Sequence, residues 1–120
     1  MLIGSISNIS FGVTHAIKTH WLKGDFPTVT RGLYGGYLTP DNVSLEHITP
    51  KSKGGRTELY NLALATKYLN NKRSSKPLKE CLTQEQADEY LSQFRGVSLK
   101  DFNGDKYAYI VGKKIKRLLK

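Results

Sequence analysis

The sequence contains a single cysteine, Cys81, among its 120 residues. One thiol cannot form a disulfide within the chain, and it cannot supply a four-thiolate zinc site. Long apolar runs are also missing, since none approaches the roughly 20 residues that a membrane-spanning helix needs. The first ten residues, MLIGSISNIS, lack the charged start and apolar core of a signal peptide. We therefore expect a soluble, cytoplasmic protein with no membrane partner.

Acidic residues are scarce. Ten Asp and Glu residues face 19 Lys and Arg residues, which gives a formal net charge of +9. On charge alone, RNA, DNA and an anionic membrane surface would all be possible partners. The length predicts one domain with one modest core, and 38% hydrophobic residues are enough for a folded but polar domain. We take residues 1–120 as a single domain.

The N-terminal half predicts a helix followed by extended segments. Apolar residues at helical spacing predict a helix over 8–23, which Gly24 ends. Turn-forming residues at 40–42, followed by an extended apolar pattern up to residue 48, predict a β-hairpin that leads into His47. Residues 61–65 form a short strand candidate. Thr66 then caps a helix that stops before Pro77.

The C-terminal half predicts two helices. A Thr-x-x-Gln capping box at Thr83 opens a helix over 83–95, with Gly96 as its end. A turn at 103–104 precedes the last helix, over 105–119. Its buried side is expected to consist of Tyr107, Ile110, Val111, Ile115, Leu118 and Leu119. Strands in the middle and helices at both ends predict an α+β fold.

The stretch from Val43 to Lys76 concentrates the residue types that phosphodiester hydrolysis needs. The attacking water must lose a proton, and a neutral imidazole such as that of His47 is suited to accept it. Charge on the phosphate oxygens must also be stabilised, which a divalent cation on one or two protein oxygens can do. Glu46 and Asn70 carry such oxygens, on a strand end and on a helix that can pack against it.

The loop between the two strands must be held in place if His47 is to stay close to its water. Asn61 is suited to this, because an amide has two donors and an acceptor and can bridge two backbone segments. Basic residues on both sides are suited to attract phosphates without reading bases. They are Lys51, Lys53, Arg56, Lys72, Arg73 and Lys76.

The pattern Leu45-Glu46-His47-Ile48-x-Pro50-x-Ser52-x-Gly54-Gly55, then Asn61-Leu62, then Asn70-x-x-Arg73 closely resembles the HNH endonuclease family. The resemblance covers about residues 33–76 and implies a ββα-metal (His-Me finger) core, which the helices on either side would flank. In that core a pair of antiparallel strands and a helix hold one divalent ion. The family is common in phages and mobile elements, which implies the cytoplasm of a bacterial or phage-infected host cell.

The resemblance implies a role for each matching residue. His47 would be the general base, Asn61 the residue that organises the loop, and Asn70 a metal ligand together with Glu46. Asn71 offers an alternative register, but Asn70 keeps the Asn-x-x-basic spacing. The ion would be Mg²⁺, with Mn²⁺, Ni²⁺ or Zn²⁺ as alternatives. The implied substrate is double-stranded DNA, and the products would carry 5′-phosphate and 3′-hydroxyl ends.

The chain departs from the family where many members carry CxxC pairs that hold a structural zinc. Residues 33–36 stand in place of the first pair, and Leu69 stands where a cysteine often precedes the Asn. We therefore expect no structural zinc. Apolar packing is expected to replace it, through Leu33, Tyr34, Tyr37 and Leu69.

Two other functions remain open from the sequence. One is a nucleic-acid-binding protein that keeps the fold without catalysis, and the other is a nuclease that acts on RNA. The oligomeric state, monomer or homodimer, is open as well, and with it the choice between nicking and cutting both strands.

Overall fold

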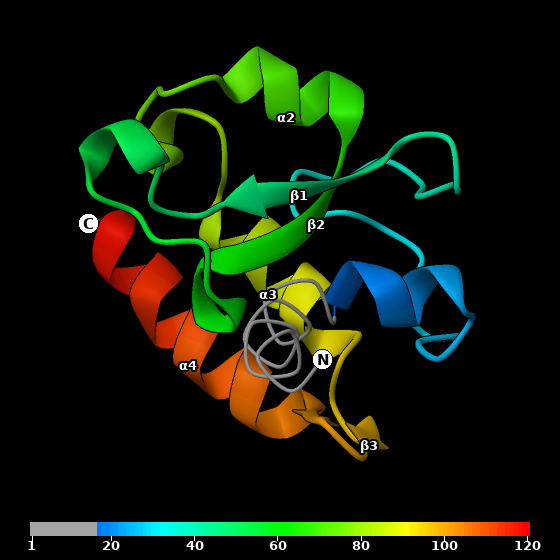
Figure 1. Cartoon of the computed structure of the whole chain (residues 1–120). Helices are drawn as coiled ribbons and strands as arrows, with labels where there is room; N and C mark the ends of the chain where they lie inside the picture. Colours follow the sequence, from blue (N-terminus) through cyan, green and yellow to red (C-terminus); the bar gives the residue numbers. More distant parts are fainter. Residues whose placement is uncertain (1–16) are drawn as a thin grey trace, which may run out of the picture.

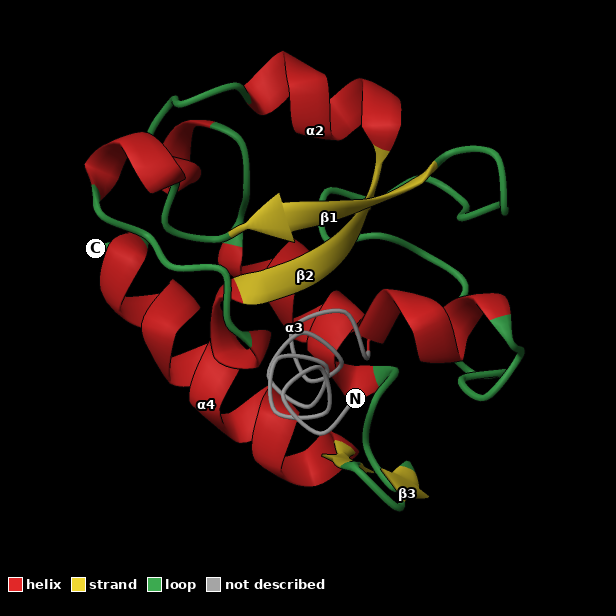
Figure 2. Ribbon diagram, viewed as in Figure 1, coloured by secondary structure: helices red, strands yellow, loops and turns green. Residues whose placement is uncertain are grey.

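The computed structural model describes residues 17–120. Two antiparallel strands, β1 (Val43–His47) and β2 (Leu62–Thr66), lie between helix α2 (Lys67–Arg73) on one side and the pair α3 (Gln84–Ser92) and α4 (Gly104–Leu118) on the other (Figure 1). A second, smaller pair consists of β3 (Ser98–Leu99) and β4 (Phe102–Asn103). Figure 2 shows that helices and loops make up most of the molecule around these strands. The expected α+β class is confirmed at this level.

The helix expected over 8–23 lies partly outside the described residues. Within them, residues 17–22 are helical. Gly24 follows with a φ of 83°, and its N–H donates to the Trp21 carbonyl at 3.0 Å. A positive φ is easy only for glycine, so Gly24 ends this helix as expected.

The expected hairpin before His47 is wrong. β1 pairs with β2, which follows it, in a register that places Val43 opposite Thr66 and His47 opposite Leu62. The turn at residues 39–42 does form, because the Asn42 side chain accepts from the Thr39 N–H at 2.8 Å. It redirects the chain into β1 without closing a hairpin.

The local signals for the helix starts are confirmed. Thr66 accepts from the Leu69 N–H at the start of α2, and Thr83 and Gln86 form the capping box of α3. The turn expected at 103–104 is the start of α4, where the Asn103 side chain accepts from the Lys106 N–H at 2.9 Å. The short β3–β4 pair just before it was not predicted.

Aromatic side chains hold the two C-terminal helices against the strands. The rings of Phe94 and Tyr107 lie 4.9 Å apart, and both residues are fully buried. The Tyr107 hydroxyl donates to the Leu62 carbonyl at 2.7 Å, and the Tyr90 hydroxyl accepts from the Leu64 N–H at 2.9 Å. These bonds fix β2 on the helix pair and thereby position β1.

The buried side of α4 is partly as expected. Tyr107, Val111 and Ile115 are fully buried, whereas the other three expected residues are only half-buried. Among residues 17–120, no helix combines the length and hydropathy that crossing a bilayer would require.

Candidate active site

His47 is the last residue of β1, and its ring is half-buried. Its Nε2 lies 2.8 Å from the Thr57 hydroxyl, while no hydrogen bond within residues 17–120 involves its Nδ1. Burial, and then the positive charge of Lys51, lower the pKa of the imidazole from its usual 6.5. The ring is therefore neutral at pH 7, and in the tautomer whose Nε2–H donates to Thr57, Nδ1 can take a proton.

The loop between β1 and β2 is pinned by Asn61, which is fully buried. Its Oδ1 accepts from the Thr49 N–H at 2.9 Å, and its Nδ2 donates to the carbonyls of Thr49 and Arg56 at 3.1 and 2.8 Å. One side chain thus ties both ends of the loop to the start of β2. This is the bridging arrangement that the sequence predicted for Asn61.

Gly55 makes the same loop compact. A Cβ at this position would stand 1.7 Å from the Thr49 carbonyl oxygen, so no other residue fits without moving the backbone. Gly54, directly before it, has a φ of 87°. The close contact at Gly55 and the positive φ of Gly54 therefore explain why both positions are glycine. They allow the loop to lie close to the strand that carries His47.

Lys114 of α4 also contacts Asn61, a contact that was not predicted from the sequence. Its ammonium donates to Asn61 Oδ1 at 2.6 Å, and burial lowers the pKa of the lysine. Because the two residues are 53 positions apart, no local spacing could have paired them.

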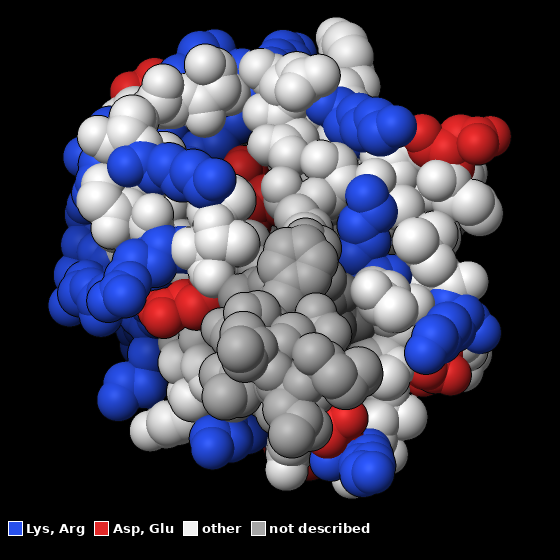
Figure 3. Space-filling view, viewed as in Figure 1, with Lys and Arg blue, Asp and Glu red and all other residues white. Residues whose placement is uncertain are grey.

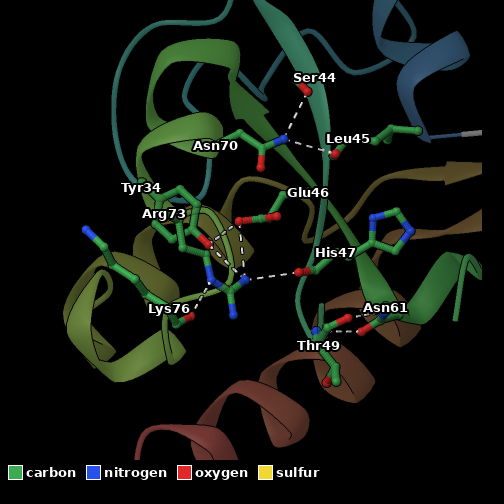
Figure 4. A network of polar contacts seen from close by, with 10 residues as sticks. All are labelled: Tyr34, Ser44, Leu45, Glu46, His47, Thr49, Asn61, Asn70, Arg73 and Lys76. Carbon is green, nitrogen blue, oxygen red and sulfur yellow. Dashed lines mark hydrogen bonds and ion pairs between the residues drawn. The ribbon is translucent and has the colours of Figure 1, made fainter. Parts of the chain in front are cut away.

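Glu46 is 5% exposed and belongs to a buried polar cluster with Tyr34 and Arg73 (Figure 4). Its Oε2 accepts from the Tyr34 hydroxyl and forms an ion pair with Arg73 Nη1 at 3.3 Å. Burial raises the pKa of the Glu46 carboxyl, and the hydroxyl and the guanidinium oppose this shift. Burial also raises the pKa of Tyr34, so its hydroxyl remains a donor.

Arg73 was expected to meet phosphates at the surface, and its burial corrects that expectation. The residue is 2% exposed. Besides Glu46, its Nη1 reaches the Tyr34 hydroxyl at 3.2 Å and the His47 carbonyl at 3.0 Å, and its Nε donates to the Lys76 carbonyl at 3.0 Å. Arg73 therefore joins the end of α2 to the strand end that carries His47.

Asn70 faces β1 from α2. Its Nδ2 donates to the Ser44 hydroxyl at 3.0 Å and to the Leu45 carbonyl at 3.1 Å. Figure 4 shows its carbonyl oxygen turned toward the Glu46 carboxylate, whose second oxygen has no hydrogen bond to the residues drawn. The amide is thus fixed through its nitrogen, and its oxygen has no hydrogen-bond partner among residues 17–120.

These two oxygens suit a hard cation. Mg²⁺ binds carboxylate and carbonyl oxygens, keeps several waters, and needs only one or two protein ligands. A ligating carboxylate is commonly held by hydrogen bonds of its own, as Tyr34 and Arg73 hold Glu46. Within residues 17–120, no cluster of three or more His, Cys, Asp or Glu side chains is placed to bind a metal. A divalent ion would therefore depend on Glu46, Asn70, water and substrate.

Glu46 and Asn70 lie on one side of β1, and the His47 ring lies on the other. Consecutive strand residues point to opposite faces. Figure 4 accordingly draws the imidazole on the other side of β1 from the carboxylate and the amide. A ligand in contact with both sides would therefore have to lie across the end of β1.

The remaining basic candidates are on the surface. They are Lys51, Lys53, Arg56, Lys72 and Lys76, all of them exposed. The apolar support expected in place of zinc is present for Leu33 and Tyr34, which are buried, and partly for Leu69. Tyr37 does not contribute to it as expected, because 66% of its surface is exposed.

Protein-family models, curated proteins and solved structures were compared with this chain, and none of the three comparisons finds a match.

Proposed function

We propose that this protein is a metal-dependent endonuclease of the HNH type, which hydrolyses phosphodiester bonds of DNA. One observation carries the proposal. At the end of β1, the Glu46 carboxylate and the Asn70 amide lie on one side of the strand, and the neutral imidazole of His47 lies on the other. This hydrolysis requires a general base and a group that stabilises charge. The residues proposed for both roles belong to one short unit of strand, loop, strand and helix.

In the proposed reaction, His47 Nδ1 accepts a proton from a water molecule while the water oxygen attacks phosphorus. The bond from phosphorus to the 3′ oxygen breaks, and that oxygen takes a proton from solvent. The products carry a 5′-phosphate and a 3′-hydroxyl. Thr57 orients the imidazole, and the loop tied down by Asn61 keeps Thr57 near it. A divalent ion on Glu46 and Asn70, Mg²⁺ in the first place, would supply positive charge at the phosphate.

Five exposed basic residues support a nucleic acid as substrate. Lys51, Lys53 and Arg56 lie on the loop beside His47, whereas Lys72 and Lys76 lie on α2 and just after it. Charges of this kind bind the phosphate backbone without regard to sequence. The proposed core has the order of a ββα-metal unit, with β1, β2 and α2 as its three elements.

The test is cleavage of a supercoiled plasmid by the purified chain, with Mg²⁺ and with chelator. We expect nicked or linear DNA only with the metal. Asn70→Ala should abolish cleavage, whereas Asn71→Ala, which changes an exposed neighbour, should leave it intact. Thermal denaturation of both variants shows whether they fold. Cleavage that survives chelation, or that Asn70→Ala does not affect, would contradict the metal role. A single-stranded RNA in parallel reactions reports the substrate class.

A further inference from the structure

A groove runs between α3 and α4, which lie side by side (Figure 1). Two adjoining hollows of about 350 and 360 Å³ form it, and they share Gln84 and Lys116. We call this feature the α3–α4 groove. None of the residues proposed above for catalysis or metal binding lines it, so it needs an explanation of its own.

The walls of the α3–α4 groove are strongly basic. Among residues 17–120, the only acidic residue that lines it is Asp88. Against this single negative charge stand five positive ones, from Lys79, Arg95, Lys113, Lys116 and Lys120. Figure 3 shows Lys and Arg gathered along the margin where Figure 1 places the C-terminal half of α4. The charge of the groove is therefore complementary to a polyanion.

Part of this charge forms a stripe on α4. Tyr109, Lys113 and Lys116 follow one another at spacings of four and three residues, which places them on one face of the helix. At 1.5 Å of rise per residue, the stripe extends for roughly 10 Å. It is long enough to meet two neighbouring groups of an extended chain.

Tyr109 adds an aromatic surface to the stripe. Its side chain is 66% exposed, and the Lys113 ammonium lies 5.3 Å from its ring centre. Burial in the core does not account for such a ring. Exposed aromatic rings next to basic side chains are the usual platform on which single-stranded nucleic acids stack their bases.

We propose that the α3–α4 groove binds a single strand of nucleic acid, with a base stacked on Tyr109 and backbone phosphates against Lys113 and Lys116. Each hollow has the volume of a small-molecule site, which accommodates one or two nucleotides of a single strand. This binding goes beyond the proposed hydrolysis and needs neither His47 nor a metal ion. Lys114, next to Lys113, contacts the loop of His47, so α4 connects the groove with the candidate active site.

The test is the fluorescence anisotropy of a labelled 12-nucleotide single-stranded DNA, titrated with the full chain in chelator at several salt concentrations. Lys113→Gln with Lys116→Gln should weaken binding and reduce the slope of log affinity against log salt by about 1.4, the value for two lost phosphate contacts. The matched control is Lys23→Gln with Lys100→Gln, which removes the same charge from exposed positions outside the groove. It should leave the slope unchanged.

The aromatic contribution has its own pair of variants. Tyr109→Leu should weaken binding about tenfold, the usual effect of one lost stacking contact, without changing the salt slope. Tyr37→Leu is the control, because Tyr37 is also 66% exposed and lies under a cation, Arg31. Equal losses from the groove variants and their controls would overturn the proposal. So would a duplex or an acidic peptide that displaces the strand at equal concentration. Binding that persists in His47→Ala while cleavage is lost supports the groove independently of the hydrolysis.

Discussion

Replacing Arg73 by methionine removes the centre of the buried polar cluster. The guanidinium donates to four groups, and one of them is the carboxylate of Glu46. Methionine has a similar length and no charge, so the main change is electrostatic. In the variant, Glu46 keeps its contact with Tyr34 but loses its counter-charge in an environment where the carboxyl is 5% exposed.

The expected loss of stability is large. Removing one partner of a buried ion pair costs about 3–5 kcal/mol, because the remaining charge is left uncompensated. A domain has only about 5–15 kcal/mol of stability in total. For a chain of this size, the loss corresponds to a fall in Tm of roughly 10–25 °C. Arg73→Met should therefore fold at 25 °C but melt far below the parent protein.

The loss should also depend on pH. Burial raises the pKa of Glu46 above its usual 4.5, and Arg73 opposes this, so the variant has a still higher pKa. The folded carboxyl then binds a proton at pH values where the unfolded one has lost it. Stability therefore falls as the pH rises from 4.5 through the folded pKa. The deficit of Arg73→Met should be greatest at pH 7 and smaller at pH 5.

Urea denaturation at pH 7 and pH 5 measures both effects. Arg31→Met is the control, because Arg31 pairs with Glu89 at 3.1 Å but is exposed, and its loss should change the midpoint little. Glu46→Gln combined with Arg73→Met removes both charges and should recover most of the loss. If Arg73→Met has a urea midpoint no lower than that of Arg31→Met, the buried ion pair does not stabilise the fold as described. The same holds if the double variant is as unstable as Arg73→Met alone.

Three further predictions follow from other contacts. Asn61→Ala should abolish plasmid cleavage and lower stability by about 1–3 kcal/mol, because the Thr49 N–H and the Arg56 carbonyl lose their partner; an active variant with the parent urea midpoint would contradict this. The cleavage rate should rise with pH through a pKa below 6.5, and Lys51→Met should move that rise to higher pH, since Lys51 helps to lower the pKa of His47; a kcat/KM profile that does not shift would count against His47 as the base. Tyr107→Phe leaves the Leu62 carbonyl without its donor and should cost about 1–3 kcal/mol in urea denaturation, whereas no change would show that this bond does not fix β2.

The sequence was most informative where structure is decided by neighbouring residues. Thr66 and Thr83 each accept from the N–H three positions ahead, so both helix starts were predictable from a few neighbouring residues. The pairing of β1 with β2 was not predictable, because the two strands are separated by a loop whose conformation no local pattern predicts. The turn at Asn42 formed as its residues indicated, but a turn does not decide which strand comes to lie beside the next one.

The candidate site divides in the same way. The amide of Asn61 acts over a short stretch of chain, and its bridging contacts could be predicted from its chemistry and position. Arg73 shows the opposite case. Its sequence neighbours are basic and polar, which indicated a surface position, but its carboxylate partner is 27 residues away. Lys114 was missed for the same reason.

The proposed hydrolysis depends above all on His47, which takes the proton from the attacking water. The most direct test compares plasmid cleavage with Mg²⁺ by the parent protein, His47→Ala and His20→Ala. His20 is a matched control, because it is half-buried and its Nδ1 lies 2.7 Å from Asp25. We expect the cleavage rate of His47→Ala to fall by about 10²–10⁴-fold. The variant should bind DNA in chelator as the parent does and melt at a similar temperature. Cleavage by His47→Ala at the parental rate, or an equal loss in His20→Ala, would contradict this role of His47.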